Sequence, residues 1–242
     1  MSKKLKLLLI LIPVIVLVII IGFIVHSVAN YTNTLKQFAI FRAEYDKAMA
    51  TIGTGEQIDM TIHSEGEISK LEKYFKENFD EVSKKIERVT VAATSFPLLD
   101  IKSLETDDRN LSMHKATLVD MRAANDEYYT SLIALFDAVA LEDEIDALEI
   151  SDKDRQEIKD AFLPVYNEWL DVAIELRALT VRANNKMDEA ITLLASNSSK
   201  WEIDNSILRI SDNNVLTKYN AIITELTTIQ AELLNVISSI EE

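Results

Sequence analysis

Apolar residues recur at steps of three and four along most of the chain, which is the spacing of one face of an α-helix. The pattern predicts five long helices: one that ends at Ile52, and others over residues 68–96, 108–148, 151–197 and 211–240. Long helices joined by short connections are typical of an up-and-down bundle. We therefore expect an all-α fold, an elongated bundle of four to five long helices. The third and fourth should each measure about 60 Å, at 1.5 Å per residue.

Polar residues at the ends of these stretches predict where the helices begin. Ser64 followed by Glu67 is a capping-box pattern for the second helix. Ser151 followed by Asp152 predicts a cap and a favourable charge for the fourth helix. Ser211 predicts the start of the fifth in the same way.

Three features interrupt the helical pattern. Residues 56–63 alternate like a strand, but a single short run without a partner predicts an ordered loop. Residues 201–210 predict a short helix or a connector. Pro164 lies inside the fourth helix and should kink it or separate its first turns, because proline has no backbone donor.

The longest apolar stretch runs from Leu7 to Val25, nineteen residues without a charge. About 20 apolar residues in a helix cross a hydrocarbon core about 30 Å thick, so this stretch predicts a transmembrane helix that contacts the membrane directly. Lys3, Lys4 and Lys6 precede it, and basic residues beside a first span stay on the cytoplasmic side. The rest of the chain should therefore lie outside the cytoplasm.

This anchor divides the chain into a cytoplasmic basic tail at 1–6, a membrane segment at 7–28 and an extracytoplasmic helical-bundle domain at 29–242. We expect a single-pass protein of a bacterial inner (plasma) membrane, with a membrane helix that continues unbroken to Ile52. The alternative is a cleaved signal peptide with residues 27–29 as its cleavage site. The apolar stretch is longer than the usual core of a signal peptide, which favours the uncleaved anchor.

Composition excludes several classes of function. The formal net charge is −15, and because the three N-terminal lysines are the only charged residues before position 29, the remainder carries −18. An acidic surface repels the phosphate backbone, so we expect no nucleic-acid partner. The chain has no cysteine, which excludes disulfides, thiolate catalysis and cysteine-ligated metal sites.

Glycine is scarce, with four residues and none after Gly66. Phosphate-binding loops, nucleophile elbows and tight hairpins use glycine where φ is positive or where the backbone approaches a ligand. The sequence therefore predicts neither a nucleotide-binding loop nor a tight hairpin after Gly66, and an almost wholly helical chain.

The histidines predict no metal centre. His26, His63 and His114 are far apart, and none belongs to a His-x-x-x-His or Glu-x-x-His arrangement, the spacings that place two ligands of a bundle metal site on one helix face. We expect no catalytic residue, no metal and no cofactor, and interpret the protein as one that is not an enzyme.

The connection between the third and fourth helices is the densest acidic region of the chain. Its carboxylates form a candidate partner-binding tip, which alternating helices would place away from the membrane: Glu142, Asp143, Glu144, Asp146, Glu149, Asp152 and Asp154. The residue order and the glycine of a calcium loop are missing. A solvated hairpin with capping acids is the favoured interpretation, because charged runs usually face solvent.

Aromatic residues supply a second candidate group, a ligand pocket or a core cluster: Asn125, Tyr128, Tyr129, Tyr166 and Trp169. If the third and fourth helices turn near 149–150, Tyr128 and Tyr129 fall level with Trp169. Aromatic walls with one polar group can form a pocket between helices. Such residues more often fill a core, and we favour that interpretation.

The layout of one span followed by a long-helix bundle resembles the outer bundles of bacterial chemoreceptor-type sensors, although no second apolar stretch and no signalling module are present. We expect an anchored module that acts by protein–protein contact, as a scaffold, adaptor or inhibitor at the outer face of a plasma membrane. The alternative is an extracytoplasmic small-molecule-binding or sensory module.

Overall fold

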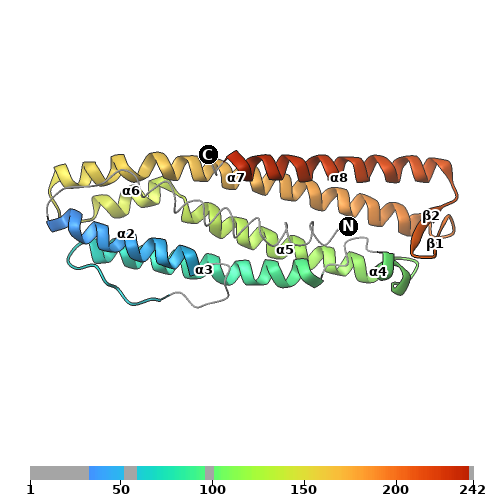
Figure 1. Ribbon diagram of the computed structural model, residues 1–242, viewed down its shortest axis with the longest axis horizontal. Coiled ribbons are helices and arrows are strands. Elements are labelled where there is room, and N and C mark those ends of the chain that lie inside the picture. Colours follow the sequence, from blue (N-terminus) through green and yellow to red (C-terminus); the bar gives the residue numbers. More distant parts are fainter. Residues whose placement is uncertain (1–32, 52–58, 96–100, 240–242) are drawn as a thin grey trace.

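The computed structural model describes residues 33–51, 59–95 and 101–239. In these ranges the chain is mostly helical, with seven helices and one two-stranded hairpin, and the long helices follow one common axis (Figure 1). The prediction of an elongated, helical fold is therefore confirmed for the described residues, with the hairpin as an exception.

The elements follow one another in this order: α2 (Asn33–Thr51), α3 (Ile68–Ser95), α4 (Ile101–Thr106), α5 (Ser112–Leu135), α6 (Ala138–Asp146), α7 (Asp152–Ser196), β1 (Trp201–Asp204), β2 (Ile207–Ile210) and α8 (Asn213–Ser239). Helix α3 packs against α2 and α5, and α7 packs against α5, α6 and α8. Helix α7 has 45 residues, so it is about 68 Å long and sets the length of the rod.

The core follows the helical spacing of the apolar residues. On α3, Leu71, Phe75, Phe79 and Val82 are separated by four, four and three positions, and each is 1% exposed. A large hydrophobic cluster joins α2, α3, α5, α6, α7 and α8, and a smaller one joins α4, α5 and α7 to Trp201 of the hairpin. Full burial of one such side chain contributes about 1.5–3 kcal/mol, so the two clusters hold the rod along its length.

Helices α2 and α3 run in the same direction, which differs from the expected alternation (Figure 1). Near the start of α2, Gln37 accepts a hydrogen bond from the backbone N–H of Glu65 at 2.9 Å. Further along, Glu44 lies 3.3 Å from Lys76 of α3. The segment 59–67 therefore runs back beside α2 before α3 begins, and the prediction of a simple up-and-down order is wrong at this point.

The single third helix expected over residues 108–148 is two helices. Helix α5 ends at Leu135 and α6 begins at Ala138. The carboxylate of Asp137 accepts hydrogen bonds from the backbone N–H groups of Val139 at 3.0 Å and Ala140 at 3.2 Å, and so caps α6. A side chain that bonds the nearby backbone in this way competes with the continuing helix, which explains the break.

The fourth helix, by contrast, is continuous through Pro164. Pro164 is exposed, as is Asp160, whose carbonyl group loses its helical partner to the proline ring. That carbonyl is on the solvent side of the helix, where water can bond it. The prediction that Pro164 separates the first turns of this helix is therefore wrong.

Residues 201–210 form an antiparallel hairpin, with Trp201 paired to Ile210 and Asp204 to Ile207. The two residues at its turn, Asn205 and Ser206, have φ values of 50° and 59°. Two consecutive positive φ values define a type I′ turn, the two-residue turn whose twist matches that of a hairpin. The expectation of a helix or connector was wrong, because it treated glycine as necessary for such a turn.

Of the three serines predicted as helix caps, Ser151 is confirmed and the other two are not. The Ser151 hydroxyl accepts a hydrogen bond from the backbone N–H of Asp154 at 3.1 Å and caps α7. The Ser64 hydroxyl instead donates to the Glu72 carboxylate at 2.6 Å, so the capping box with Glu67 does not form. The buried carboxylate takes the hydroxyl away from the helix terminus.

The predicted cap of the last helix is displaced by one residue. The Ser211 hydroxyl donates to the carbonyl oxygen of Lys200 at 3.0 Å, at the base of the hairpin. The carboxylate of Asp212 accepts from the backbone N–H groups of Asn214 at 3.0 Å and Val215 at 3.2 Å and caps α8.

The predicted membrane segment at residues 7–25 lies outside the described residues, as does the continuation of its helix up to Asn33. Among helices α2 to α8, none combines the length and the apolar character that crossing a bilayer requires.

The turn of the hairpin provides a test of the fold. Because Ser206 has a φ of 59°, Ser206→Gly should remove about 1–2 kcal/mol of left-handed strain and add about 0.5–1 kcal/mol of conformational entropy cost, which leaves a net stabilisation of up to about 1.5 kcal/mol. Chemical denaturation would measure this change. The control is Ser199→Gly, between α7 and β1. Ser199 does not have a positive φ, so this substitution should not stabilise the protein. If Ser206→Gly destabilises the protein, the turn does not have the conformation described.

Candidate functional site

A buried ion pair lies where α2, α3 and the segment 59–67 meet. Glu72 and Lys76 are four residues apart on α3, and their side chains are 0% and 2% exposed. The Lys76 Nζ lies 2.8 Å from Glu72 Oε1 and donates to the carbonyl oxygen of Thr61 at 2.5 Å. Buried charges are unfavourable unless they are paired and hydrogen-bonded, and both conditions are met here.

The Glu72 carboxylate also binds the backbone of the returning segment. It accepts hydrogen bonds from the N–H of His63 at 3.0 and 3.1 Å, and from the N–H of Ser64 at 2.7 Å. Burial raises the pKa of Glu72, but the hydrogen bonds from Lys76, Ser64 and His63 outweigh burial and leave the pKa below its ordinary value. The carboxylate is therefore held in its charged form.

Three metal-ligating side chains meet at the exposed edge of this ion pair. His63 Nδ1 lies 2.9 Å from Glu44 Oε2. One donor atom each of Glu44, Asp59 and His63 lie within 4.8 Å of one another. An imidazole nitrogen with two carboxylate oxygens is a donor set that divalent transition metals accept. We call these three residues, with Glu72 and Lys76, the His63 cluster.

The sequence did not predict the His63 cluster. The expectation rested on ligand pairs within one helix, whereas Asp59 and His63 lie in the non-helical segment 59–67 and Glu44 comes from α2. The alternation of residues 56–63 could have indicated the site. In an extended segment, side chains four positions apart, such as those of Asp59 and His63, lie on the same side.

A second polar group joins Ser103, Asp107 and His114 at the junction of α4 and α5. Asp107 Oδ2 lies 2.6 Å from His114 Nδ1, and Ser103 Oγ lies 3.3 Å from His114 Nε2. The order of these contacts is that of a Ser–His–Asp triad. However, His114 is 0% exposed, and a fully buried imidazole does not reach a substrate.

The contacts of Asp107 indicate what this second group does. Its carboxylate accepts hydrogen bonds from the backbone N–H groups of His114 at 3.0 Å and Met113 at 3.2 Å, in the first turn of α5. Burial raises the pKa of Asp107, but the hydrogen bonds from His114 and Met113 outweigh it, so the pKa lies below its ordinary value. The arrangement fixes the start of α5 and its junction with α4.

The residues predicted as a ligand or core cluster are mostly core residues. Four of the five lie in the large hydrophobic cluster and are each 5% exposed or less: Tyr128, Tyr129, Tyr166 and Trp169. The fifth, Asn125, is half-buried. The Tyr128 hydroxyl is buried with no hydrogen-bond partner among the described residues. Burial raises the pKa of Tyr128 well above its ordinary value. This placement is that of core residues.

The aromatic residues do not share the level that was expected. The Tyr129 hydroxyl lies 2.9 Å from Thr180 Oγ1, and burial raises the pKa of Tyr129 to about 12. Trp169 instead stacks on Phe136, with 6.0 Å between the ring centroids. The break at Asp137 shifts the register between α5 and α7, so the prediction that Tyr129 lies level with Trp169 is wrong.

The candidate acidic tip is partly neutralised by its own cations. The Lys159 Nζ lies 2.9 Å from Glu142 and 2.7 Å from Asp146. The Arg155 guanidinium lies 2.7 Å from Asp152 and donates to a backbone carbonyl of the turn. These pairs reduce the charge that the tip presents to a basic partner.

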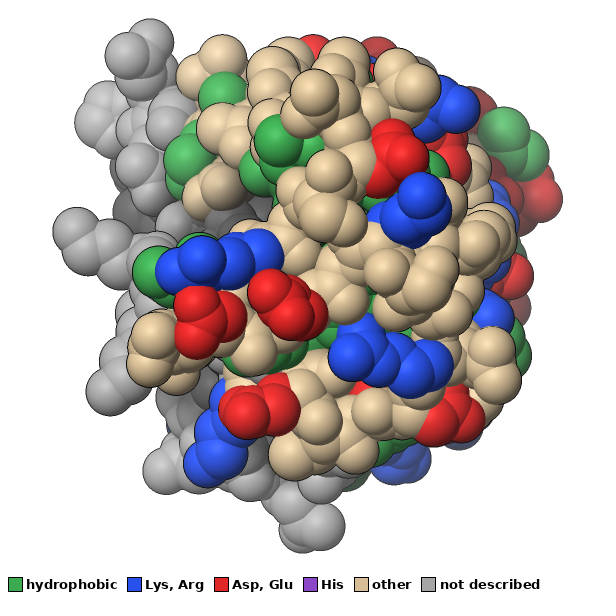
Figure 2. Space-filling model, turned by 90° about the vertical axis from the view of Figure 1, so that its right-hand side faces the viewer, with side chains coloured by type: hydrophobic (Ala, Val, Ile, Leu, Met, Phe, Trp, Pro, Cys, Tyr) green, Lys and Arg blue, Asp and Glu red, His purple; other side chains and the backbone are tan. Residues whose placement is uncertain are grey.

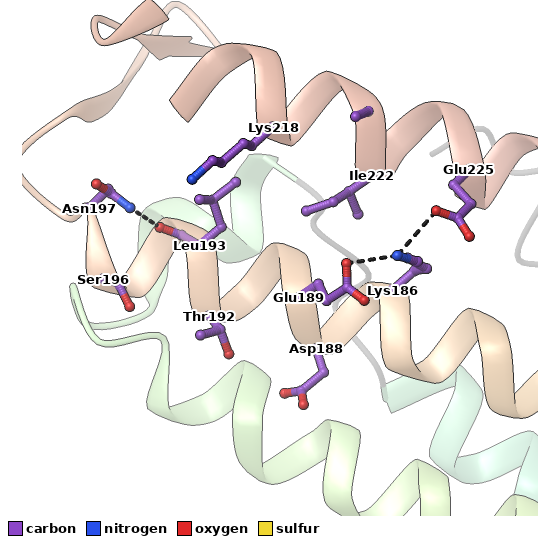
Figure 3. A pocket seen from close by; sticks show the side chains of 11 residues that line it. Lys186, Asp188, Glu189, Thr192, Leu193, Ser196, Asn197, Lys218, Ile222 and Glu225 are labelled. Carbon is purple, nitrogen blue, oxygen red and sulfur yellow. Dashed lines mark hydrogen bonds and ion pairs between the residues drawn. The ribbon is translucent and has the colours of Figure 1, made fainter. Parts of the chain in front are cut away.

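An open groove of about 690 Å³ lies between α7 and α8 (Figure 3). Leu193 and Ile222 approach each other across it. Its Lys186 ammonium is bonded to Glu189 at 2.8 Å and to Glu225 at 3.1 Å. These three charged groups of the groove therefore bond one another.

Comparison with protein-family models, with curated proteins and with solved structures gave no match for this chain. Its function is therefore inferred from the fold and from the groups described above.

The buried ion pair makes a prediction about stability. Lys76→Met leaves the Glu72 charge buried without its partner and should destabilise the protein by about 3–5 kcal/mol. The matched control is Lys73→Met, which removes an exposed pair of the same helical spacing with Glu77 and should change stability by less than about 1 kcal/mol. Denaturant titration measures both. Equal effects of the two substitutions would contradict a structural role for Lys76.

The lowered pKa values of Glu72 and Asp107 predict a dependence on acid. Each carboxyl releases its proton more readily in the folded state, so its stabilisation is complete above the unfolded pKa values of about 4.3 and 3.9 and is lost as pH falls through the folded values. The denaturant concentration at the unfolding midpoint, measured from pH 7 to pH 3, should therefore decrease once the pH is lower than about 5. Asp107→Asn should flatten this fall, and Asp120→Asn, at an exposed position of α5, should leave it unchanged.

Proposed function

We propose that the chain is a single-span, membrane-anchored helical rod that acts by binding another protein at the outer face of a plasma membrane. The uncharged stretch at residues 7–25, preceded by three lysines, is the observation that carries this proposal. The function is non-enzymatic in this view, because the Ser103–His114–Asp107 group is buried and fixes a helix junction.

The direction of α2 decides which end of the rod faces the membrane. Phe38, in the second turn of α2, packs on Phe162 in the third turn of α7, with 5.0 Å between the ring centroids. Both helices therefore begin at the same end, the one that carries α6 and the 147–151 connection; we call it the acidic end. If the anchor leads directly into Asn33, the acidic end lies near the bilayer, opposite to the sequence-based expectation.

The other end of the rod, which carries β1 and β2, then lies farthest from the bilayer, and we call it the hairpin end. Figure 2 shows acidic and basic side chains interleaved over this end, with small apolar areas between them. Its exposed apolar side chains include Ile207 (56% exposed), Met113 and Leu216. The Arg109 guanidinium lies 4.6 Å from the centre of the Trp201 ring. Arginine and methionine are enriched in protein interfaces, so we assign the partner to the hairpin end.

A small-molecule-binding or sensory function is the second candidate. The open groove between α7 and α8 favours it, because its volume is in the range of ligand sites. The Tyr128 and Trp169 region gives it less support, since these side chains are packed in the core.

Site-specific crosslinking in intact cells tests the proposal. A photoreactive residue at Ile207 should yield a crosslink to a second protein, and the same residue at Val139 of α6, which is also exposed, should not. A reporter fused to the C-terminus and active only outside the cytoplasm should be active.

Each outcome has a separate meaning. An inactive reporter contradicts the proposed topology. A crosslink only from Val139 would move the binding surface to the acidic end. Absence of any crosslink from either position contradicts a protein partner at the two ends of the rod.

A further inference from the structure

The His63 cluster combines three donor atoms with a negative charge that its own cations do not balance. The buried ammonium of Lys76 pairs with the carboxylates of Glu44 and Glu72, the exposed Lys47 reaches Glu44 at 3.9 Å, and Asp59 adds a third carboxylate. Three carboxylates against two ammonium groups leave an excess of negative charge on the acidic and basic side chains of the group.

From this geometry we infer that Glu44, Asp59 and His63 form a binding site for a divalent transition-metal ion of the Zn²⁺ class. Zinc bonds to nitrogen and oxygen are about 2.0–2.2 Å long, which places two tetrahedral ligand atoms about 3.4 Å apart. His63 Nδ1 and Glu44 Oε2 are 2.9 Å apart, and the three donor atoms lie within 4.8 Å of one another. An ion therefore needs the separations between these atoms to change by no more than about 1.4 Å.

The donor set selects among cations. Calcium takes six to eight oxygen ligands and magnesium prefers oxygen and water, whereas an imidazole favours zinc and its neighbours. Asp59 and His63 are exposed and Glu44 is partly exposed, so water can complete the coordination.

The neighbours of the three ligands hold them in place. The backbone of His63 is bonded to the buried Glu72 carboxylate at 3.0 Å, and the Asp59 carboxylate accepts from the backbone N–H of Thr61 at 2.9 Å. The first bond fixes the backbone that carries His63, and the second, to the ligating carboxylate itself, is of the kind that orients metal ligands. Lys76 donates to Glu44 Oε2 at 3.3 Å, and because a carboxylate has about four lone-pair positions, Glu44 keeps others for a cation.

The position of the site predicts what the ion does. Glu44 belongs to α2, whereas Asp59 and His63 belong to the segment that returns beside it. An ion bound to all three would join α2 to this segment in the folded state only, and so stabilise the fold by mass action. The site is structural in this view, and it is independent of the proposed partner.

Zinc titration of the full-length, detergent-solubilised protein tests the inference. After chelator treatment and dialysis, calorimetry should show saturable binding of one Zn²⁺ per chain, and Zn²⁺ should raise the thermal unfolding midpoint. His63→Gln and Asp59→Asn should each weaken binding by at least tenfold and remove the midpoint shift. His26 and His114 remain in both variants, so the loss reports on the cluster.

The matched control is Glu77→Gln, an exposed carboxylate on α3 outside the cluster, which should bind Zn²⁺ like the parent protein. Circular dichroism of each variant without metal checks that it is folded. Absence of saturable binding, or equal affinity in His63→Gln and Glu77→Gln, would overturn the inference. Preference for Ca²⁺ over Zn²⁺ would do so as well, because calcium does not use the imidazole.

Discussion

The ion pair between Glu72 and Lys76 determines how the first third of the described chain is arranged. A fully buried carboxylate must be surrounded by donors, and the Glu72 carboxylate finds them in Lys76 and in the backbone of His63 and Ser64. These bonds place the segment 59–67 against α3, so that it runs back along α2. Helices α2 and α3 are consequently parallel, and α2 begins at the acidic end of the rod.

This arrangement changes the significance of the charged surface. The sequence alone predicted an acidic tip far from the membrane, with a solvated hairpin as the favoured interpretation and a partner-binding surface as the alternative. Its Glu142, Asp146 and Asp152 are instead paired with Lys159 and Arg155 of the same end. In the proposed orientation this end faces the bilayer, and the hairpin end is left as the surface that a partner meets first.

The sequence predicts those features that depend on local periodicity. The continuous stripe of α7 and the cap at Ser151 follow from spacing and from one hydroxyl, and both occur in the structure. Features that depend on competition between distant groups were not predicted. The sequence predicts that Ser64 caps a helix, but its hydroxyl donates to the carboxylate of Glu72, eight positions later.

The hairpin was missed for a different reason. Glycine is the usual residue at positive φ, but asparagine tolerates that region, and the pairing of β1 with β2 stabilises the turn that Asn205 and Ser206 form. The scarcity of glycine in the sequence therefore does not exclude a tight hairpin. The break at Asp137 is similar, because a single capping carboxylate outweighs an apolar spacing that would support a longer helix.

The two histidine groups show why burial, rather than residue type, separates a binding site from a structural contact. His114 and His63 each lie within 3 Å of a carboxylate, and each is near a second polar side chain. His114 is 0% exposed and both its ring nitrogens are bonded inside the protein, so it can only hold α4 and α5 together. The side chain of His63 is 38% exposed, and two carboxylates share its open side. A ligand from solvent therefore reaches His63 and not His114, although the sequence gives no reason to distinguish them.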